Sequence, residues 1–259
     1  MEEKIVIVTD ASGKKLYETT NETNEFYQNR LDQLNRWITD LDKYEELELK
    51  YKTGQDFNTL RNLYSLDALV TITSIDLSII TTELYLNKSR MKQIFYMKQV
   101  YLLIYEAYET YNSKKQFLRN LIQKSNPLLI EEFNAIGILE RVFIKDFKLT
   151  TLIKNVRHKV GGHIDREFRT WYDTVITLDP HHTANMAIAF MQAFSPIQHL
   201  TMKLAGVEHE KFIKHNNDST NSFNELLGKI EDLTAKVNEK RPDGQKLDFD
   251  MNVFRNMLK

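Results

Sequence analysis

The chain has 259 residues, of which 42% are hydrophobic and 27% charged, and its formal net charge is −1. This balance is that of an ordinary globular protein, and the low counts of Gly (8) and Pro (4) disfavour a turn-rich β protein or a low-complexity chain. The absence of Cys excludes disulfides, thiolate zinc sites and a cysteine nucleophile. It also fits a reducing compartment, so we expect a cytoplasmic protein.

The first 18 residues have an extended rather than a helical pattern. Residues 4–9 are rich in β-branched side chains, and residues 11–14 resemble a turn, so a short strand or β-hairpin is expected within residues 1–18. The start is acidic and its apolar run is short, which is not typical of a signal peptide. No stretch approaches about 18 uncharged apolar residues, so we expect no membrane span.

From about Thr20 onward, apolar residues recur at the helical period. We predict helices over residues 20–53, 57–87, 90–123, 128–144, 149–164, 180–207 and 222–239. Residues 165–179 are expected to form a loop with a short element, and residues 215–221 a polar linker. Pro196 is expected to kink its helix.

Long helices with short connections predict an all-α, up-and-down bundle. We divide the chain into an extended segment (1–18), an N-terminal helix (19–55), a helical core (56–207), and a C-terminal helix and tail (208–259). Apolar residues nearly encircle the 57–87 helix, which predicts a central position. A stripe of Tyr101, Tyr105 and Tyr108 in the next helix is expected to pack in the core with its hydroxyls at the rim.

Charge is unevenly distributed along the chain. Residues 1–56 contain 13 acidic and 8 basic side chains, whereas residues 86–124 contain 8 basic and 2 acidic and residues 145–169 contain 7 basic and 3 acidic. If the two basic segments meet in space, they form a surface suited to phosphate. The alternative is that they are solvated helix faces that pair with the acidic N-terminal helix.

The most informative segment is Asn155–His163. Its valines belong to the apolar stripe of the 149–164 helix, and Arg157 lies off that stripe. Two adjacent glycines, Gly161 and Gly162, cost roughly 1 kcal/mol each inside a helix. They indicate either a helix end, which His163 simply follows, or a place where a ligand or another backbone approaches closely.

Arg157-His158-Lys159-Val160-Gly161-Gly162-His163 resembles the signature of the HEPN superfamily, which is an Arg, a polar residue and a His four to six residues after the Arg. Here the spacing is Arg-x5-His, with His158 as the polar residue. The resemblance implies a HEPN-like helical bundle over the core, frequently a homodimer with the motif at its interface. Residues 1–55 and 208–259 are not covered by it.

The resemblance further implies a metal-independent endoribonuclease without a cofactor, as in a toxin or phage-defence effector that a protein partner neutralises. His163 would transfer protons, Arg157 would stabilise charge on the phosphate, and His158 would orient it or contact a further phosphate. Four further residues are expected to bind RNA phosphates or donate a hydrogen bond: Lys154, Asn155, Lys159 and Arg166.

A non-catalytic reading stays open beside this one. Arg157 would then pair with Glu106, Glu109 or Asp165, His163 would be a cap residue, and the chain would be an interaction protein that dimerises through the Gly161–Gly162 face. His181 and His182 have no carboxylate at ligand spacing, so we expect surface or capping roles and no metal site.

Overall fold

A computed structural model describes residues 13–51, 57–161 and 168–239 of the chain. Every regular element among these residues is a helix, which confirms the predicted all-α fold. The N-terminal hairpin expected within residues 1–18 falls largely outside the described residues. The chain divides into two units, residues 1–206 and 207–259, and each is considered by itself.

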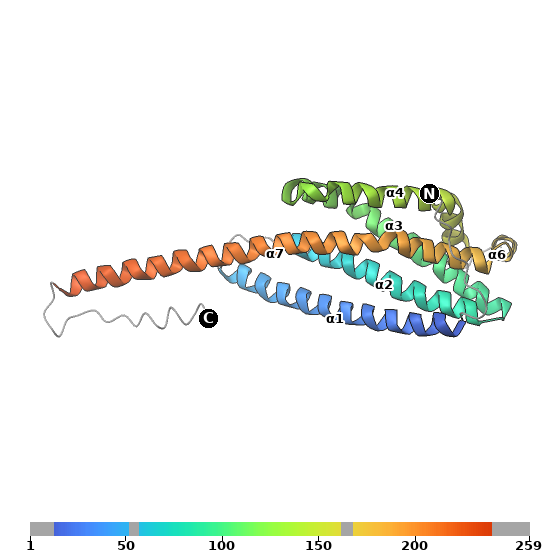
Figure 1. Cartoon of the computed structure of the whole chain (residues 1–259), viewed down its shortest axis with the longest axis horizontal. Coiled ribbons are helices and arrows are strands. Elements are labelled where there is room, and N and C mark those ends of the chain that lie inside the picture. Colours follow the sequence, from blue (N-terminus) through green and yellow to red (C-terminus); the bar gives the residue numbers. More distant parts are fainter. Residues whose placement is uncertain (1–12, 52–56, 162–167, 240–259) are drawn as a thin grey trace. The chain divides into compact units, whose positions relative to one another are not determined.

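The first unit is a bundle of long helices (Figure 1). Its main members are α1 (Gly13–Tyr51), α2 (Asn58–Leu86), α3 (Arg90–Ser125), α4 (Ile130–Asp146) and the part of α7 (Pro180–Asn238) up to Gly206. Thr20 bonds Thr82 near one end of the α1–α2 pair, and Glu45 bonds Arg61 near the other, so these helices are antiparallel. The bundle is therefore up-and-down, as predicted.

The bundle core between α3, α4 and α7 is aromatic. Phe190 and Phe194 of α7 stack with ring centroids 4.1 Å apart, and Phe143 of α4 lies edge-on to Phe190 at 5.3 Å. Tyr111 of α3 completes the group, edge-on to Phe194 at 5.3 Å. Rings that meet edge to face add roughly 0.5–1.5 kcal/mol per pair beyond the burial of their area.

Helix α2 contacts α1, α3 and α7, which agrees with its predicted central position, but Ile72 and Ile79 leave part of its apolar surface exposed. Its buried residues include Leu63 and Leu77, both fully inaccessible. By length and composition α2 is the one helix, among the described residues, that is apolar enough to cross a membrane, although the sequence had led us to expect none. Half of its most apolar window is buried inside the protein, and a core helix meets the same criterion.

Two segments that were predicted to be non-helical are helical in the structure. α1 already begins at Gly13, because residues 14–18 are mostly good helix formers, so residues 13–18 are not extended. In the second unit α7 continues through residues 215–221, where we expected a linker. That segment is polar but contains neither Gly nor Pro, and its residues each cost at most about 0.7 kcal/mol relative to Ala in a helix.

Two other elements refine the predictions. Residues 165–179 contain α6 (Phe168–Ile176), the short element expected there. Asp179 accepts a hydrogen bond from the backbone N–H of His182 at 2.7 Å, which caps α7 at the predicted start near residue 180. Pro196 stands inside α7 without ending the helix.

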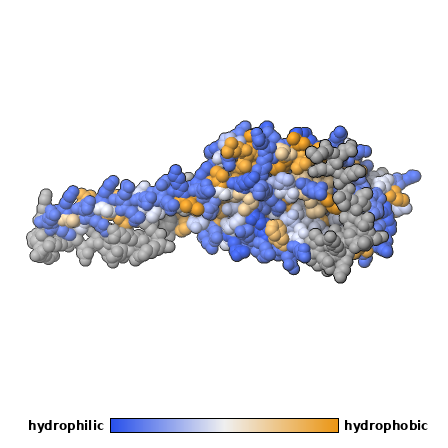
Figure 2. All heavy atoms as spheres, viewed as in Figure 1, coloured by the Kyte–Doolittle hydropathy of each residue, from blue (hydrophilic) through white to orange (hydrophobic). Residues whose placement is uncertain are grey.

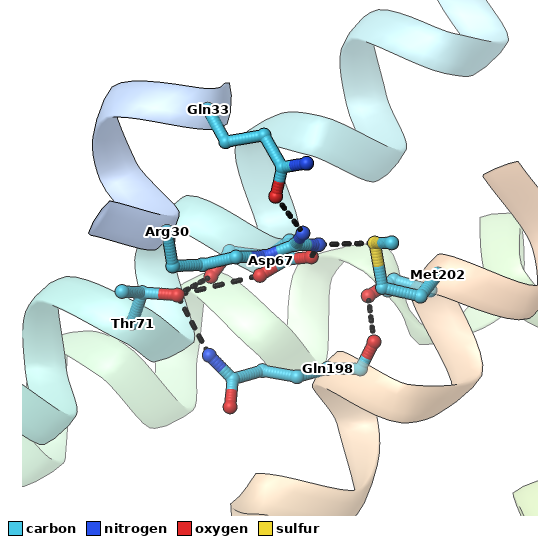
Figure 3. A network of polar contacts seen from close by, with 7 residues as sticks. Arg30, Gln33, Asp67, Thr71, Gln198 and Met202 are labelled. Carbon is cyan, nitrogen blue, oxygen red and sulfur yellow. Dashed lines mark hydrogen bonds and ion pairs between the residues drawn. The ribbon is translucent and has the colours of Figure 1, made fainter. Parts of the chain in front are cut away.

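A buried polar network joins α1, α2 and α7 (Figure 3). The guanidinium of Arg30 forms an ion pair with Asp67, which is only 1% exposed, and contacts the sulfur of Met202. The hydroxyl of Thr71 bonds Oδ1 of Asp67 at 3.3 Å and accepts a hydrogen bond from Gln198 at 2.6 Å. Three helices thus share one satisfied network around a single carboxylate.

The tyrosines of α3 lie mostly in the core, as predicted. Tyr101 and Tyr111 are each 1% exposed and Tyr108 is 9% exposed, whereas Tyr105 is partly exposed. Burial, reinforced by the carboxylate of Glu140, raises the pKa of Tyr108 to about 12. Burial raises the pKa of Tyr111 further still.

These tyrosines predict a stability that falls at alkaline pH. A phenol ionises near pH 10 in an unfolded chain, so a folded pKa above that value stabilises the protein below pH 10 and loses its effect as pH rises. We expect the free energy of unfolding to fall between about pH 10 and pH 12, measured by urea unfolding with tyrosinate absorbance. Tyr108→Phe should flatten this fall, whereas Tyr172→Phe, at an exposed position, should not. A free energy independent of pH across this interval would contradict the burial argument.

Candidate functional site

The segment singled out by the sequence is helical but irregular. It consists of a π-helical turn (Leu149–Ile153), one α-helical turn α5 (Lys154–Val156) and a second π-helical turn (Arg157–Gly161). Lys148, just before it, has a left-handed backbone with φ of 52°, and its carbonyl accepts bonds from three following amides. π-helical turns are rare and occur frequently at functional sites.

The apolar stripe of this segment explains its packing. Leu149, Ile153 and Val156 are at most 1% exposed, at the spacing i, i+4, i+7. These residues fix the segment against the core and direct its polar side chains outward. The predicted stripe is confirmed at these three positions, whereas the side chains of Val160 and Ile164 lie outside the described residues.

Arg157 points toward α3 and is held there by two side chains. Its Nε donates to Oε1 of Glu106 at 2.8 Å, and its Nη2 lies 2.7 Å from the same oxygen. Its guanidinium carbon also lies 5.5 Å from the ring centre of Tyr105, a cation–π distance. Glu106, one of the three partners that the non-catalytic interpretation allowed, therefore pairs with Arg157.

His158 lies beside this guanidinium. Its Nδ1 is 3.3 Å from Nη1 of Arg157, and its ring meets that of Tyr105 edge-on at 5.8 Å. The four residues Tyr105, Glu106, Arg157 and His158 are called the Arg157 cluster below. It unites two of the predicted catalytic residues with two residues of α3.

The Arg157 cluster remains open to solvent. The side chains of Arg157 and Glu106 are 28% and 51% exposed, and His158 is exposed. An exposed ion pair of this kind contributes only about 0–1 kcal/mol. A phosphate that approaches Arg157 therefore competes with a weak partner, and the guanidinium stays available to it.

The predicted phosphate-binding residues separate into two groups. Lys154 is exposed, and no ion pair to it is found in the described part of the chain. Asn155 and Lys159 instead line a groove of about 410 Å³ that faces α6, together with Asp173. The segment thus directs Arg157 and His158 toward α3. It directs the side chains of Asn155 and Lys159 toward α6.

Two predicted site residues, His163 and Arg166, lie outside the described residues, as does Gly162. Whether the glycines end the helix is therefore untested. Elsewhere, His181 and His182 are exposed at the start of α7. Over residues 13–51, 57–161 and 168–239, no group of three His or acidic side chains could hold a metal ion.

Tyr105 is the site residue that sequence reasoning placed least well, whereas Glu106 was one of the three partners expected for Arg157. Tyr105 was assigned to the core, but it forms one side of the Arg157 cluster. Glu106 is one of only 2 acidic residues in the basic segment 86–124, and that isolation is the signal that points to it. Its partner is 51 positions away along the chain, which no local pattern reveals.

Comparison of the chain with family models, curated proteins and solved structures finds no match.

Proposed function

We propose that the chain binds RNA and cleaves it without a metal ion, at a site formed by Arg157, His158 and His163. The observation that supports this most directly is the exposed pairing of Arg157 with His158, whose side chains come within 3.3 Å of one another. An arginine fork recognises a phosphate, and an imidazole exchanges protons near neutral pH. Lys154 and Lys159, on the same short segment, add positive charge.

The chemistry follows the HEPN-like resemblance. The 2′-hydroxyl of RNA attacks the adjacent phosphorus, and the bond to the 5′-oxygen breaks, which leaves a 2′,3′-cyclic phosphate and a 5′-hydroxyl. One proton leaves the 2′-oxygen and one reaches the 5′-oxygen. We assign this proton transfer to His163. Arg157 stabilises the additional negative charge on the pentacoordinate phosphorus. Incubation of single-stranded RNA with the purified protein in EDTA tests the proposal.

Glu106 gives a test of RNA binding that is separate from cleavage. Glu106→Gln removes the charge that competes for Arg157, so we expect RNA to bind up to about fivefold more tightly, as an exposed ion pair is worth at most about 1 kcal/mol. Fluorescence anisotropy with a labelled RNA measures this. Glu109→Gln, an exposed position on the same helix, is the matched control and should have a smaller effect. Equal effects of both variants would mean that Arg157 is not the group released.

A second candidate function is a non-catalytic interaction protein. The observation that favours it is the exposed apolar surface of α4, where Figure 2 shows hydrophobic side chains among hydrophilic ones. Its exposed members include Ile138 and Val142, which are 55% and 52% exposed and one turn apart. Exposed apolar patches are common at protein interfaces. Either function is compatible with a homodimer or a neutralising protein partner.

A further inference from the structure

A second site lies between α3 and α4, away from the Arg157 cluster. The facing surfaces of these antiparallel helices enclose an open groove of about 720 Å³, which is within the usual size of small-molecule sites. We call it the α3–α4 groove. Its charged lining consists of Lys115 and Arg119 from α3 and Glu140 and Arg141 from α4.

The charges of the groove do not balance. Lys115 donates to Oε1 of Glu140 at 2.7 Å, and Glu140, only 3% exposed, also accepts a hydrogen bond from the buried Tyr108. That carboxylate is therefore already satisfied by its own neighbours. Arg119 and Arg141 are exposed, and no carboxylate in the described part of the chain pairs with either, so the groove keeps two uncompensated guanidinium groups.

Arg119 and Arg141 line the same groove. The pair of Lys115 and Glu140 sets the register of the two antiparallel helices, so from helix geometry we expect position 119, one turn further along α3, to lie near position 137 of α4. Arg141 extends back along α4, so that its Nη1 lies 3.6 Å from the point where a Cβ on Gly137 would stand. Gly137 lines the groove without a side chain, which leaves room beside the guanidinium of Arg141.

From this geometry we propose that the α3–α4 groove binds a nucleoside diphosphate. Two arginines that line one groove suit the oxygens of a diphosphate, because each guanidinium can bind a phosphate through two hydrogen bonds. Phe133 supplies an aromatic surface for a base in the same groove, and Asn112 and Asn134 supply amides that can donate to or accept from the edge of a base. This site does not depend on RNA cleavage at Arg157.

Isothermal titration calorimetry of the full chain with ADP, GDP, CDP and UDP tests the proposal. We expect saturable one-to-one binding of at least one nucleotide, and a loss of affinity of at least tenfold in Arg119→Gln/Arg141→Gln. Both residues are exposed, so the variant should fold, and circular dichroism checks this. The matched control is Lys124→Gln/Arg169→Gln, which removes the same charge at exposed positions outside the groove and should bind like the wild type.

Inorganic pyrophosphate and adenosine separate the two halves of the ligand. We expect each to bind at least tenfold more weakly than the preferred nucleotide. Pyrophosphate that binds as tightly as the nucleotide would overturn the assignment of a nucleoside ligand. Absence of saturable binding at about 1 mM of all four nucleotides, or equal binding by both double variants, would overturn the site itself.

Discussion

Asp67→Ala is expected to lower the free energy of unfolding by about 3–5 kcal/mol, the usual cost of removing one partner of a buried ion pair. The carboxylate is 1% exposed, and its loss leaves the guanidinium of Arg30, itself only 15% exposed, without a counter-charge (Figure 3). Thr71 also loses its acceptor on that carboxylate. For a unit of this size the melting temperature should fall by on the order of 10 °C, measured by calorimetry.

Asp40→Ala is the matched control, because it also removes a carboxylate that forms an ion pair. Asp40 and its partner Lys43 are 57% and 67% exposed, so solvent screens their attraction and the change should cost little stability. Arg30→Met/Asp67→Leu should recover much of the loss, since both charges are then absent from the interior. Equal destabilisation by Asp67→Ala and Asp40→Ala would show that the network contributes little.

The same network shows where sequence reasoning stops. The apolar periodicity of residues 57–87 predicts α2 within one residue at each end, because seven of its thirteen buried side chains are apolar and recur at the helical period. Asp67 is one polar residue among these apolar positions, and the pattern gives no sign that it is buried and paired. Its partner Arg30 is 37 positions away and Gln198 lies on a third helix, so no local signal announces the network.

Helix ends without a strong signal were predicted less well than helix interiors. Asp179-Pro180 predicts the start of α7 because a side-chain cap and a proline act locally. The polar residues 215–221 contain no comparable stop, and the helix passes through them. The π-helical turns on either side of α5 also lie beyond prediction, since their residues have the same apolar spacing as an ordinary helix.

At the candidate site the sequence placed residues but not their directions. The stripe of Leu149, Ile153 and Val156 correctly predicted which side of the segment is buried. The stripe gave no reason to expect that Arg157 and Lys159 face different helices. The structure separates them, since Arg157 pairs with Glu106 of α3 and Lys159 lines the groove beside α6. Irregular helical turns change the direction of successive side chains, and periodicity alone assumes a regular helix.

RNA cleavage is the property on which the proposed function depends. We expect the wild type to cleave single-stranded RNA in EDTA and to leave 2′,3′-cyclic phosphate ends, detected by gel electrophoresis and mass spectrometry. His163→Ala should lower the rate by about 10²–10⁴-fold, the usual contribution of a general acid or base. Arg157→Ala should lower it by about 10²–10³-fold, the usual effect of removing a group that stabilises the transition state.

The controls for this assay remove the same residue types at exposed positions elsewhere. His181→Ala at the start of α7 and Arg169→Ala in α6 should cleave at the wild-type rate. Arg157→Lys keeps the charge but loses the fork, so it should recover only part of the activity. A wild type that leaves RNA intact, or one whose cleavage survives both His163→Ala and Arg157→Ala, would contradict the nuclease proposal. Because the pair of Arg157 and Glu106 is exposed and weak, an unchanged melting temperature in Arg157→Ala would assign any loss of cleavage to chemistry rather than to unfolding.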